Sequence, residues 1–189
     1  MAEPIDMDAQ IAAHLGVVEW LRGQIELLHR IADTLIEIFK NGGRLYLLGN
    51  GGSAADAQHI ATELVGRFLV DRKALPAVAL TTDCAILTAV GNDFDADHVF
   101  VRQVEAHVRP GDAVWALSVS GTSPNVIAAV ARTREIGATI IGFTSQSGAQ
   151  LAEYCDHCLR VESAVTPRVQ EVHELAYHLV CHRIEQAFE

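Results

Sequence analysis

Residues 44–57 read RLYLLGNGGSAADA, and this stretch decides the fold. The short apolar run at 44–48 is typical of a buried strand, and the glycines that follow mark its end. Residues 53–68 then read as a helix, for which Ser53 is a natural N-cap. The stretch therefore predicts a strand that turns tightly into a helix.

Two later stretches repeat this strand, loop and helix pattern: residues 114–126 read VWALSVSGTSPNV, and residues 140–151 read IIGFTSQSGAQL. Over the whole chain, short apolar strands alternate with helices. This alternation predicts an α/β fold, a doubly wound, five-stranded parallel sheet flanked by helices. The expected strands are 44–48, 77–80, 113–118, 139–143 and 158–161, and the expected helices between and after them are 53–68, 84–90, 97–107, 124–136, 150–154 and 166–188.

A helical arm is predicted before the first strand. Residues 5–41 contain no proline, and apolar side chains recur at helical spacing from Ile11 to Ile38. We expect one long helix or two in succession, ended by Asn41-Gly42-Gly43. The domain organisation is therefore an arm over residues 1–43, used in packing subunits, and one domain over residues 44–189.

Composition limits the classes of function. The chain has 189 residues, of which 50% are hydrophobic, enough for a sizeable core. Its 24 acidic and 14 basic residues give a net charge of −10, which disfavours binding to nucleic acid or to an anionic membrane. A phosphorylated substrate is compatible with this charge, because it needs only a local pocket.

Targeting and redox patterns point to the cytoplasm. No apolar run approaches the length of a membrane span, and the first residues, MAEPIDMDAQ, lack a signal pattern. Four cysteines are too few for a disulfide framework. Cys155 and Cys158 match a C-x-x-C pair, whose alternatives are a redox or zinc role, but Cys84 and Cys181 do not supply the second close pair of a structural zinc site.

The first glycine-rich loop runs from Gly49 to Ser53. Glycines after a strand let the backbone approach a ligand, and free N–H groups at a helix start favour an anion. A tight structural turn is the plain alternative. The loop also fits G-x-G-x-x-A, but the acidic residue of a dinucleotide site is expected about 20 residues on, and Asp83 lies too far along the chain.

The second loop places four hydroxyl side chains within Ser118–Ser123, directly before a helix that starts with Pro124. Hydroxyls and helix N-terminal amides form a neutral cradle for a phosphate monoester. The alternative is a capped helix whose spare hydroxyls face water.

Two helices carry possible metal or acid–base groups. His59 and Glu63 are four residues apart on the helix after the first loop, so they share one face. The last helix carries Gln170, Glu171, His173, Glu174, His178 and His182. Spacing alone does not choose among the pairings there, and a solvated helix face is the alternative on both helices.

Taken together, these segments resemble the sugar isomerase (SIS) domain proteins, and among them the phosphoheptose isomerases. The resemblance rests on LLGNGGSAADAQHIATEL, PAVALTTD, LTAVGNDF, SVSGTSPNV and TPRVQEVHELAYH, which span most of residues 44–188. It implies a flavodoxin-like fold and an enzyme that converts sedoheptulose 7-phosphate to D-glycero-D-manno-heptose 7-phosphate through an enediol. This reaction is the first step in making heptose precursors of lipopolysaccharide or capsule.

The resemblance also implies site residues. It assigns one Zn²⁺ per subunit to His59, Glu63, Gln170 and His178, with Glu63 and His178 as the catalytic acid–base pair. His173, Glu174 and His182 do not fall on the family's ligand positions. The implied substrate contacts are Asn50, Gly51, Gly52, Ser53, Glu63, Asn92, Asp93, Ser118, Val119, Ser120, Ser123 and Gln170.

A related regulator that binds the replication initiator DnaA shares the fold and loops. Its pattern lacks the helix glutamate and the second histidine of the final helix, whereas this chain has Glu63 and His178. The enzyme interpretation is therefore favoured over a non-catalytic SIS module. The resemblance further implies a homotetramer, consistent with the apolar arm and with metal ligands on separate helices.

Overall fold

The computed structural model describes residues 5–189, so residues 1–4 of the predicted arm lie outside the described residues. Its sheet has five strands, all parallel, in the order β2-β1-β3-β4-β5. This order confirms the predicted doubly wound fold. The strands are β1 (Leu45–Gly49), β2 (Ala77–Ala79), β3 (Ala113–Leu117), β4 (Thr139–Ser145) and β5 (His157–Val161).

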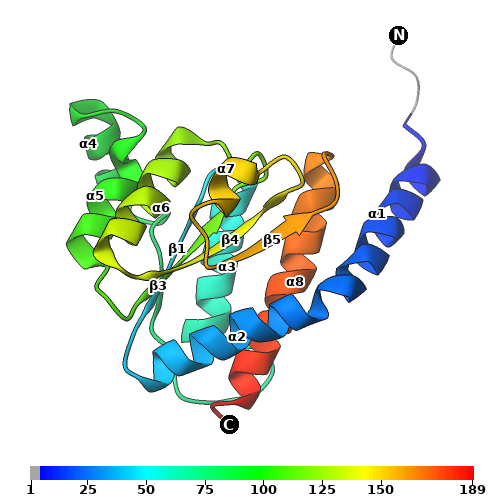
Figure 1. Ribbon diagram of the computed structural model, residues 1–189, viewed down its shortest axis with the longest axis horizontal. Coiled ribbons are helices and arrows are strands. Elements are labelled where there is room, and N and C mark those ends of the chain that lie inside the picture. The colour runs from blue at the N-terminus through cyan, green and yellow to red at the C-terminus, as the bar shows by residue number, and fades with distance from the viewer. Residues whose placement is uncertain (1–4) are drawn as a thin grey trace.

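Eight α-helices and one short 3₁₀ helix, η1, surround or extend the sheet within the described part of the chain (Figure 1). They are α1 (Met7–Leu21), η1 (Arg22–Gln24), α2 (Ile25–Lys40), α3 (Gly52–Val65), α4 (Cys84–Asp93), α5 (His98–His107), α6 (Pro124–Ile136), α7 (Ala149–Ala152) and α8 (Thr166–Gln186).

The two faces of the sheet have separate cores. Helices α2, α3 and α8 pack on one face, around side chains such as Leu35, Ile60 and Tyr177. Helices α5, α6 and α7 supply the other core, with Phe100 and Val130 among its buried members. Central strands buried on both faces explain the apolar run from which the fold was predicted.

The predicted arm divides at η1 into two helices that behave differently. Helix α2 buries one face, including Leu28, Ile31 and Leu35, in the core. Helix α1 extends away from the sheet and buries only Leu21 (Figure 1). Of the two arrangements expected for the arm, one long helix or two in succession, the structure has the second, while the division of the chain at residue 43 stays a prediction.

Both predicted ends of the helix at 53–68 are wrong. Ser53 is not the N-cap of α3, because the cap is Gly51 and the helix begins at Gly52. The backbone of Gly51 has φ +56° and ψ −121°, a conformation open to glycine, and it turns the chain two residues earlier than a serine cap would. Helix α3 also ends at Val65, not at residue 68, since the chain turns away at Gly66.

The topology puts the loops after β1 and β3 next to each other. These are the neighbouring central strands from which the chain proceeds in opposite directions across the sheet. Ligands of open α/β sheets bind at such a switch point, at the carboxyl ends of the strands. Both loops singled out in the sequence therefore lie at the edge where a ligand is expected.

One buried histidine makes fold stability depend on pH. His173 on α8 is fully buried, and its Nε2 donates a hydrogen bond to the carbonyl of Thr144 at 3.3 Å. Its Nδ1 has no partner among residues 5–189. Burial lowers the pKa of His173 to about 4 against the Thr144 hydrogen bond, because a second ring proton would find no acceptor there.

We therefore predict that the free energy of unfolding falls as the pH drops from about 6.5 towards 4. The unfolded chain binds the proton that the folded chain excludes, so the loss is on the order of 3 kcal/mol. Urea denaturation at pH 7 and pH 4.5 measures it. His173→Phe should flatten this slope, whereas His107→Gln, at an exposed histidine at the end of α5, should keep it; an unchanged slope in His173→Phe would contradict the prediction.

Candidate active site

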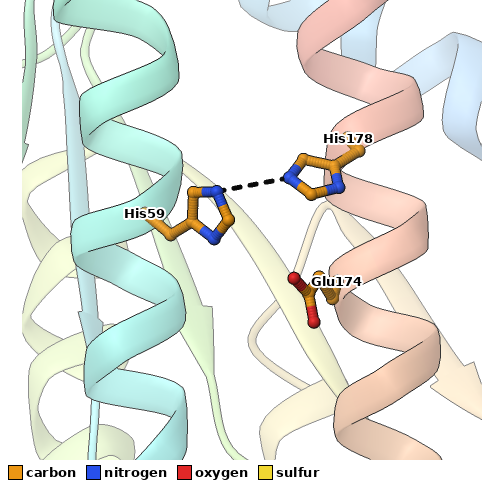
Figure 2. Close-up of side chains that lie close together, drawn as sticks. All are labelled: His59, Glu174 and His178. Carbon is orange, nitrogen blue, oxygen red and sulfur yellow. Dashed lines mark hydrogen bonds between the residues drawn. The ribbon is translucent and has the colours of Figure 1, made fainter. Parts of the chain in front are cut away.

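Helices α3 and α8 bring together imidazoles that lie far apart in the sequence. Figure 2 shows His59 on α3 and His178 on α8 pointing towards each other, with Glu174 one turn from His178. The two Nε2 atoms are 3.4 Å apart. Ligand atoms of His59, Glu174 and His178 all lie within 4.8 Å of one another, which is close enough for all three to reach one metal ion.

Glu63 joins this cluster through His59. Its Oε1 lies 3.0 Å from the Nε2 of His59, as their spacing on α3 predicts. Glu63 is largely buried, with 15% of its side chain exposed, whereas 39% of His59 is exposed. The structure thus places His59 between Glu63 and His178, the two residues predicted as an acid–base pair.

Tyr177 fixes the orientation of His59. The Oη of Tyr177 lies 2.9 Å from Nδ1 of His59, so Nε2 is left to face Glu63 and His178. Tyr177 is fully buried, and burial, helped by nearby carboxylates that include Asp56 and Glu174, raises its pKa. The hydroxyl therefore stays protonated, and a histidine whose second ring nitrogen is held in this way is a typical metal ligand.

The cluster concentrates negative charge. Asp56, one turn before His59 on α3, is half-buried, and its Oδ2 has no partner among the described residues. Burial and the nearby Glu174 raise the pKa of Asp56 to about 6, against the opposing effect of His59. Asp56, Glu63 and Glu174 thus crowd carboxylates around two imidazoles, a setting that favours a bound cation.

Gln170 lies at the start of α8, against the first loop. A Cβ at Gly52 would meet the end of the Gln170 side chain, so the glycine leaves room for this amide beside the loop. Gln170 is four residues before Glu174 and thus on the same side of α8. The predicted substrate residues Gly51, Gly52 and Ser53 therefore adjoin the amino end of α8.

The two loops are tied together by a pair of amides. The Nδ2 of Asn50 donates to Oδ1 of Asn125 at 2.8 Å, and the Nδ2 of Asn125 donates back to Asn50 at 3.0 Å. Asn125 was not among the predicted site residues. Its position directly after the hydroxyl-rich loop, at the first turn of α6, is the only sequence signal that could have indicated it.

The hydroxyl-rich loop folds around the amino end of α6. Ser118 is buried, and its Oγ lies 3.3 Å from Oγ of Ser123 and accepts the N–H of Gly121 at 3.2 Å. Val119 is half-buried, and its carbonyl accepts from Ser145 N, which ties this loop to the end of β4. Ser120 is exposed, and no side-chain cap from Ser123 occupies the first turn of α6. The arrangement suits an anion at this helix start.

Asn92 and Asp93 lie apart from the cluster. They end helix α4, where both are exposed and Asn92 donates to Asp93 at 2.9 Å. Helix α4 buries none of its residues in the described chain. Asp83, considered above for a dinucleotide site, instead caps α4 by accepting the N–H of Ile86.

The other polar residues of α8 singled out in the sequence lie in different surroundings. His173 faces the sheet core, His182 packs on the ring of Phe68, and Glu171 pairs with His14 of α1 at 2.8 Å. Glu174, by contrast, joins His59 and His178, although the resemblance gave it no ligand role. Its position four residues before His178 was a signal, but spacing alone did not show which face of α8 meets α3.

Other sequence features are also placed. Within residues 5–189, His59, Glu174 and His178 form the one group of three side chains close enough to share a metal ion. Cys155 and Cys158 therefore have no third ligand in the described chain. All four cysteines are free thiols. None of the described helices is both long and apolar enough to cross a membrane.

Comparison with known proteins agrees with this geometry. Residues 13–145 match the family model of the SIS domain. The chain is 53% identical to the phosphoheptose isomerase of Rhodospirillum rubrum over 156 residues, covering 82% of this chain and 83% of that protein. It is 52% identical to the Roseiflexus enzyme of the same name, covering 86% and 83%.

Solved structures give the same result. The phosphoheptose isomerase of Neisseria gonorrhoeae superposes with a TM-score of 0.89 at 38% identity, covering 95% of this chain and 97% of that one. The Francisella tularensis enzyme superposes with a TM-score of 0.92 at 30% identity, covering 95% and 96%. This chain is a SIS-domain protein and belongs to the phosphoheptose isomerase family.

Proposed function

We propose that this protein interconverts sedoheptulose 7-phosphate and D-glycero-D-manno-heptose 7-phosphate. The observation that carries the proposal is the convergence of Glu63 and His178, from two helices, on the imidazole of His59. The named relatives support the substrate, because phosphoheptose isomerases match this chain along most of their length.

The reaction moves a proton between two neighbouring carbons and leaves the composition of the sugar unchanged. A base removes a proton from C1 of the ketose, the resulting enediol gains a proton at C2, and a hydroxyl proton moves from O1 to O2. A carboxylate suits the carbon step as a general base, and an imidazole suits the oxygen step because one ring nitrogen can accept a proton while the other donates one. We assign the first to Glu63 and the second to His178.

The phosphate is assigned to the loop Ser118–Ser123. Its hydroxyls and the amino end of α6 form a neutral anion cradle. Asn50, tied to Asn125, and the backbone of Gly51 and Gly52 would border the rest of the sugar. Binding the remote phosphate in this way holds the reacting carbons in one position.

The donor set fits a zinc ion. Two imidazole Nε2 atoms and a carboxylate are ligands that Zn²⁺ prefers, and Tyr177 holds the second nitrogen of His59 as a metal-binding histidine requires. We propose His59, Glu63, Gln170 and His178 as the residues that would hold it, with Glu174 as a further carboxylate at the site. When bound, zinc would polarise the sugar oxygens as a Lewis acid.

We further propose that the enzyme acts in the cytoplasm as a homotetramer and supplies heptose for lipopolysaccharide or capsule. Helix α1 supports the oligomer, since it leaves Met7, Ile11 and Leu15 60–72% exposed at i, i+4 spacing. Helix α4, which has no buried residue, is a second candidate surface for subunit contacts.

The substitution Glu63→Gln tests the catalytic assignment. It removes the base and keeps the shape, so kcat for sedoheptulose 7-phosphate should fall by at least about 100-fold while KM changes little. Product formation followed by NMR measures both constants, and Glu153→Gln on the exposed turn after α7 is the control. Full activity in Glu63→Gln, or no turnover by the wild-type protein, would contradict the proposal.

Metal removal tests the zinc assignment. A chelator should strip about one zinc per chain and abolish turnover, and added Zn²⁺ should restore it. His59→Gln should lose bound zinc in elemental analysis of the purified protein. His182→Gln, an exposed imidazole one turn beyond His178, should keep the metal; equal zinc content in the two variants would argue against this site.

Light scattering tests the assembly. We expect a mass about four times the 20.4 kDa of one chain. The double substitution Ile11→Glu and Leu15→Glu should lower it, because charges on the apolar stripe of α1 would remain solvated rather than pack. A wild-type monomer in solution would rule out the tetramer.

A further inference from the structure

A buried ion pair joins the carboxyl ends of the two helices that carry the site. Glu185 lies in the last turn of α8, and Arg72 lies in the loop that follows α3. Each side chain is 1% exposed, and Oε1 of Glu185 is 3.8 Å from Nε of Arg72. Charged groups are almost never buried like this unless they are paired and hydrogen-bonded, so their other contacts show what they hold.

Glu185 holds the backbone of the loop. Its carboxylate accepts the N–H groups of Phe68 at 2.9 Å, Leu69 at 2.8 Å and Val70 at 3.3 Å. Burial raises the pKa of Glu185, but the three N–H groups and Arg72 outweigh burial, and the pKa lies below its usual value. The group is therefore an ionised acceptor that ties three consecutive residues to α8.

Arg72 holds the end of α3. Its Nη2 donates to the carbonyl of Glu63 at 2.6 Å, and its Nη1 donates to that of Leu64 at 2.7 Å and of Lys73 at 3.1 Å. A cation at this position satisfies carbonyls that have no partner within the helix and complements the helix dipole. One of the carbonyls it holds belongs to the residue proposed as the base.

The same loop returns a side chain to α8. The ring of Phe68 lies 5.5 Å, between centroids, from the imidazole of His178 and 5.8 Å from that of His182. Phe68 is half-buried, and its N–H is one of the three that Glu185 accepts. The position of the ring that packs on His178 therefore depends on Glu185.

We propose that Arg72 and Glu185 are positioning residues for the isomerisation. Arg72 sets the end of α3 that carries Glu63, and Glu185 sets the loop that packs Phe68 on His178, so the pair fixes one acid–base group relative to the other. The inference rests on the proposed function. Neither residue contacts the predicted phosphate loop, so the pair acts on the rate of the chemical step and not on substrate binding.

The test is Glu185→Gln in the full-length assembled protein, with kcat and KM for sedoheptulose 7-phosphate measured from pH 5.5 to 9. Displacing a catalytic group by about 1 Å can cost on the order of 100-fold in rate, so kcat should fall by about 10- to 100-fold while KM stays within about 3-fold. The pH profile of kcat should shift as well, because His178 would sit in altered surroundings. Arg72→Lys keeps the charge but not the fork of donors, so it should fall between Glu185→Gln and wild type.

Asp112→Asn is the matched control. Asp112 is another buried carboxylate that accepts two backbone N–H groups, of Arg44 at 2.9 Å and Arg109 at 2.8 Å, but neither partner belongs to α3, to α8 or to the loop after α3. Its loss should lower the melting temperature as Glu185→Gln does and leave kcat and the pH profile unchanged. Equal kinetic effects in the two variants would show that Glu185 is merely structural.

Other results are also decisive. A folded Glu185→Gln protein with kcat within about 2-fold of wild type would overturn the inference. If that variant does not fold, Arg72→Lys and Phe68→Leu decide, since wild-type kcat in both would overturn it and a lower kcat at unchanged KM would support it. A wild-type protein without isomerase activity would contradict the proposed function, and with it the roles of Glu63 and His178.

Discussion

Helices α3 and α8 lie side by side on one face of the sheet, and the contact between Tyr177 and His59 links their packing to the geometry of the candidate site. The tyrosine ring belongs to the core, while its hydroxyl reaches the imidazole on the neighbouring helix. Burial of the ring thus fixes the direction of Nε2, which faces Glu63 and His178. The same apolar contact that stabilises the fold therefore orients the site.

The charges of the polar groups between these helices do not compensate one another. Carboxylates of Asp56, Glu63 and Glu174 surround two imidazoles, one carboxyl oxygen of Asp56 is unpartnered in the described chain, and the pKa of Asp56 is raised to about 6. Desolvated like charges of this kind disfavour one another unless a proton or a cation compensates them. A divalent ion would relieve the repulsion and use the same atoms as ligands.

Much of the fold follows from local pattern, whereas the site follows from it only in part. Apolar strands and glycine-rich loops predicted the sheet, and the parallel topology then put both loops at one edge. The start of α3 was missed because a serine is a good cap in isolation, but the positive φ of Gly51 turns the chain earlier. Asn125 was missed, and Glu174 was not chosen among the candidates of α8, because these contacts depend on which faces of separate elements meet, and helical spacing within one element does not carry that information.

Under the proposed function, Glu63 would be both a zinc ligand and the catalytic base. A carboxylate bound to zinc is a weaker base, so a site that relied on Glu63 alone for both tasks would compromise each. Glu174 lies within 4.8 Å of the same imidazole atoms and offers a second anionic ligand. If the site held zinc as proposed, Glu174 would remain as an anionic ligand while Glu63 served as the base, so the two proposed roles of Glu63 would not have to compete.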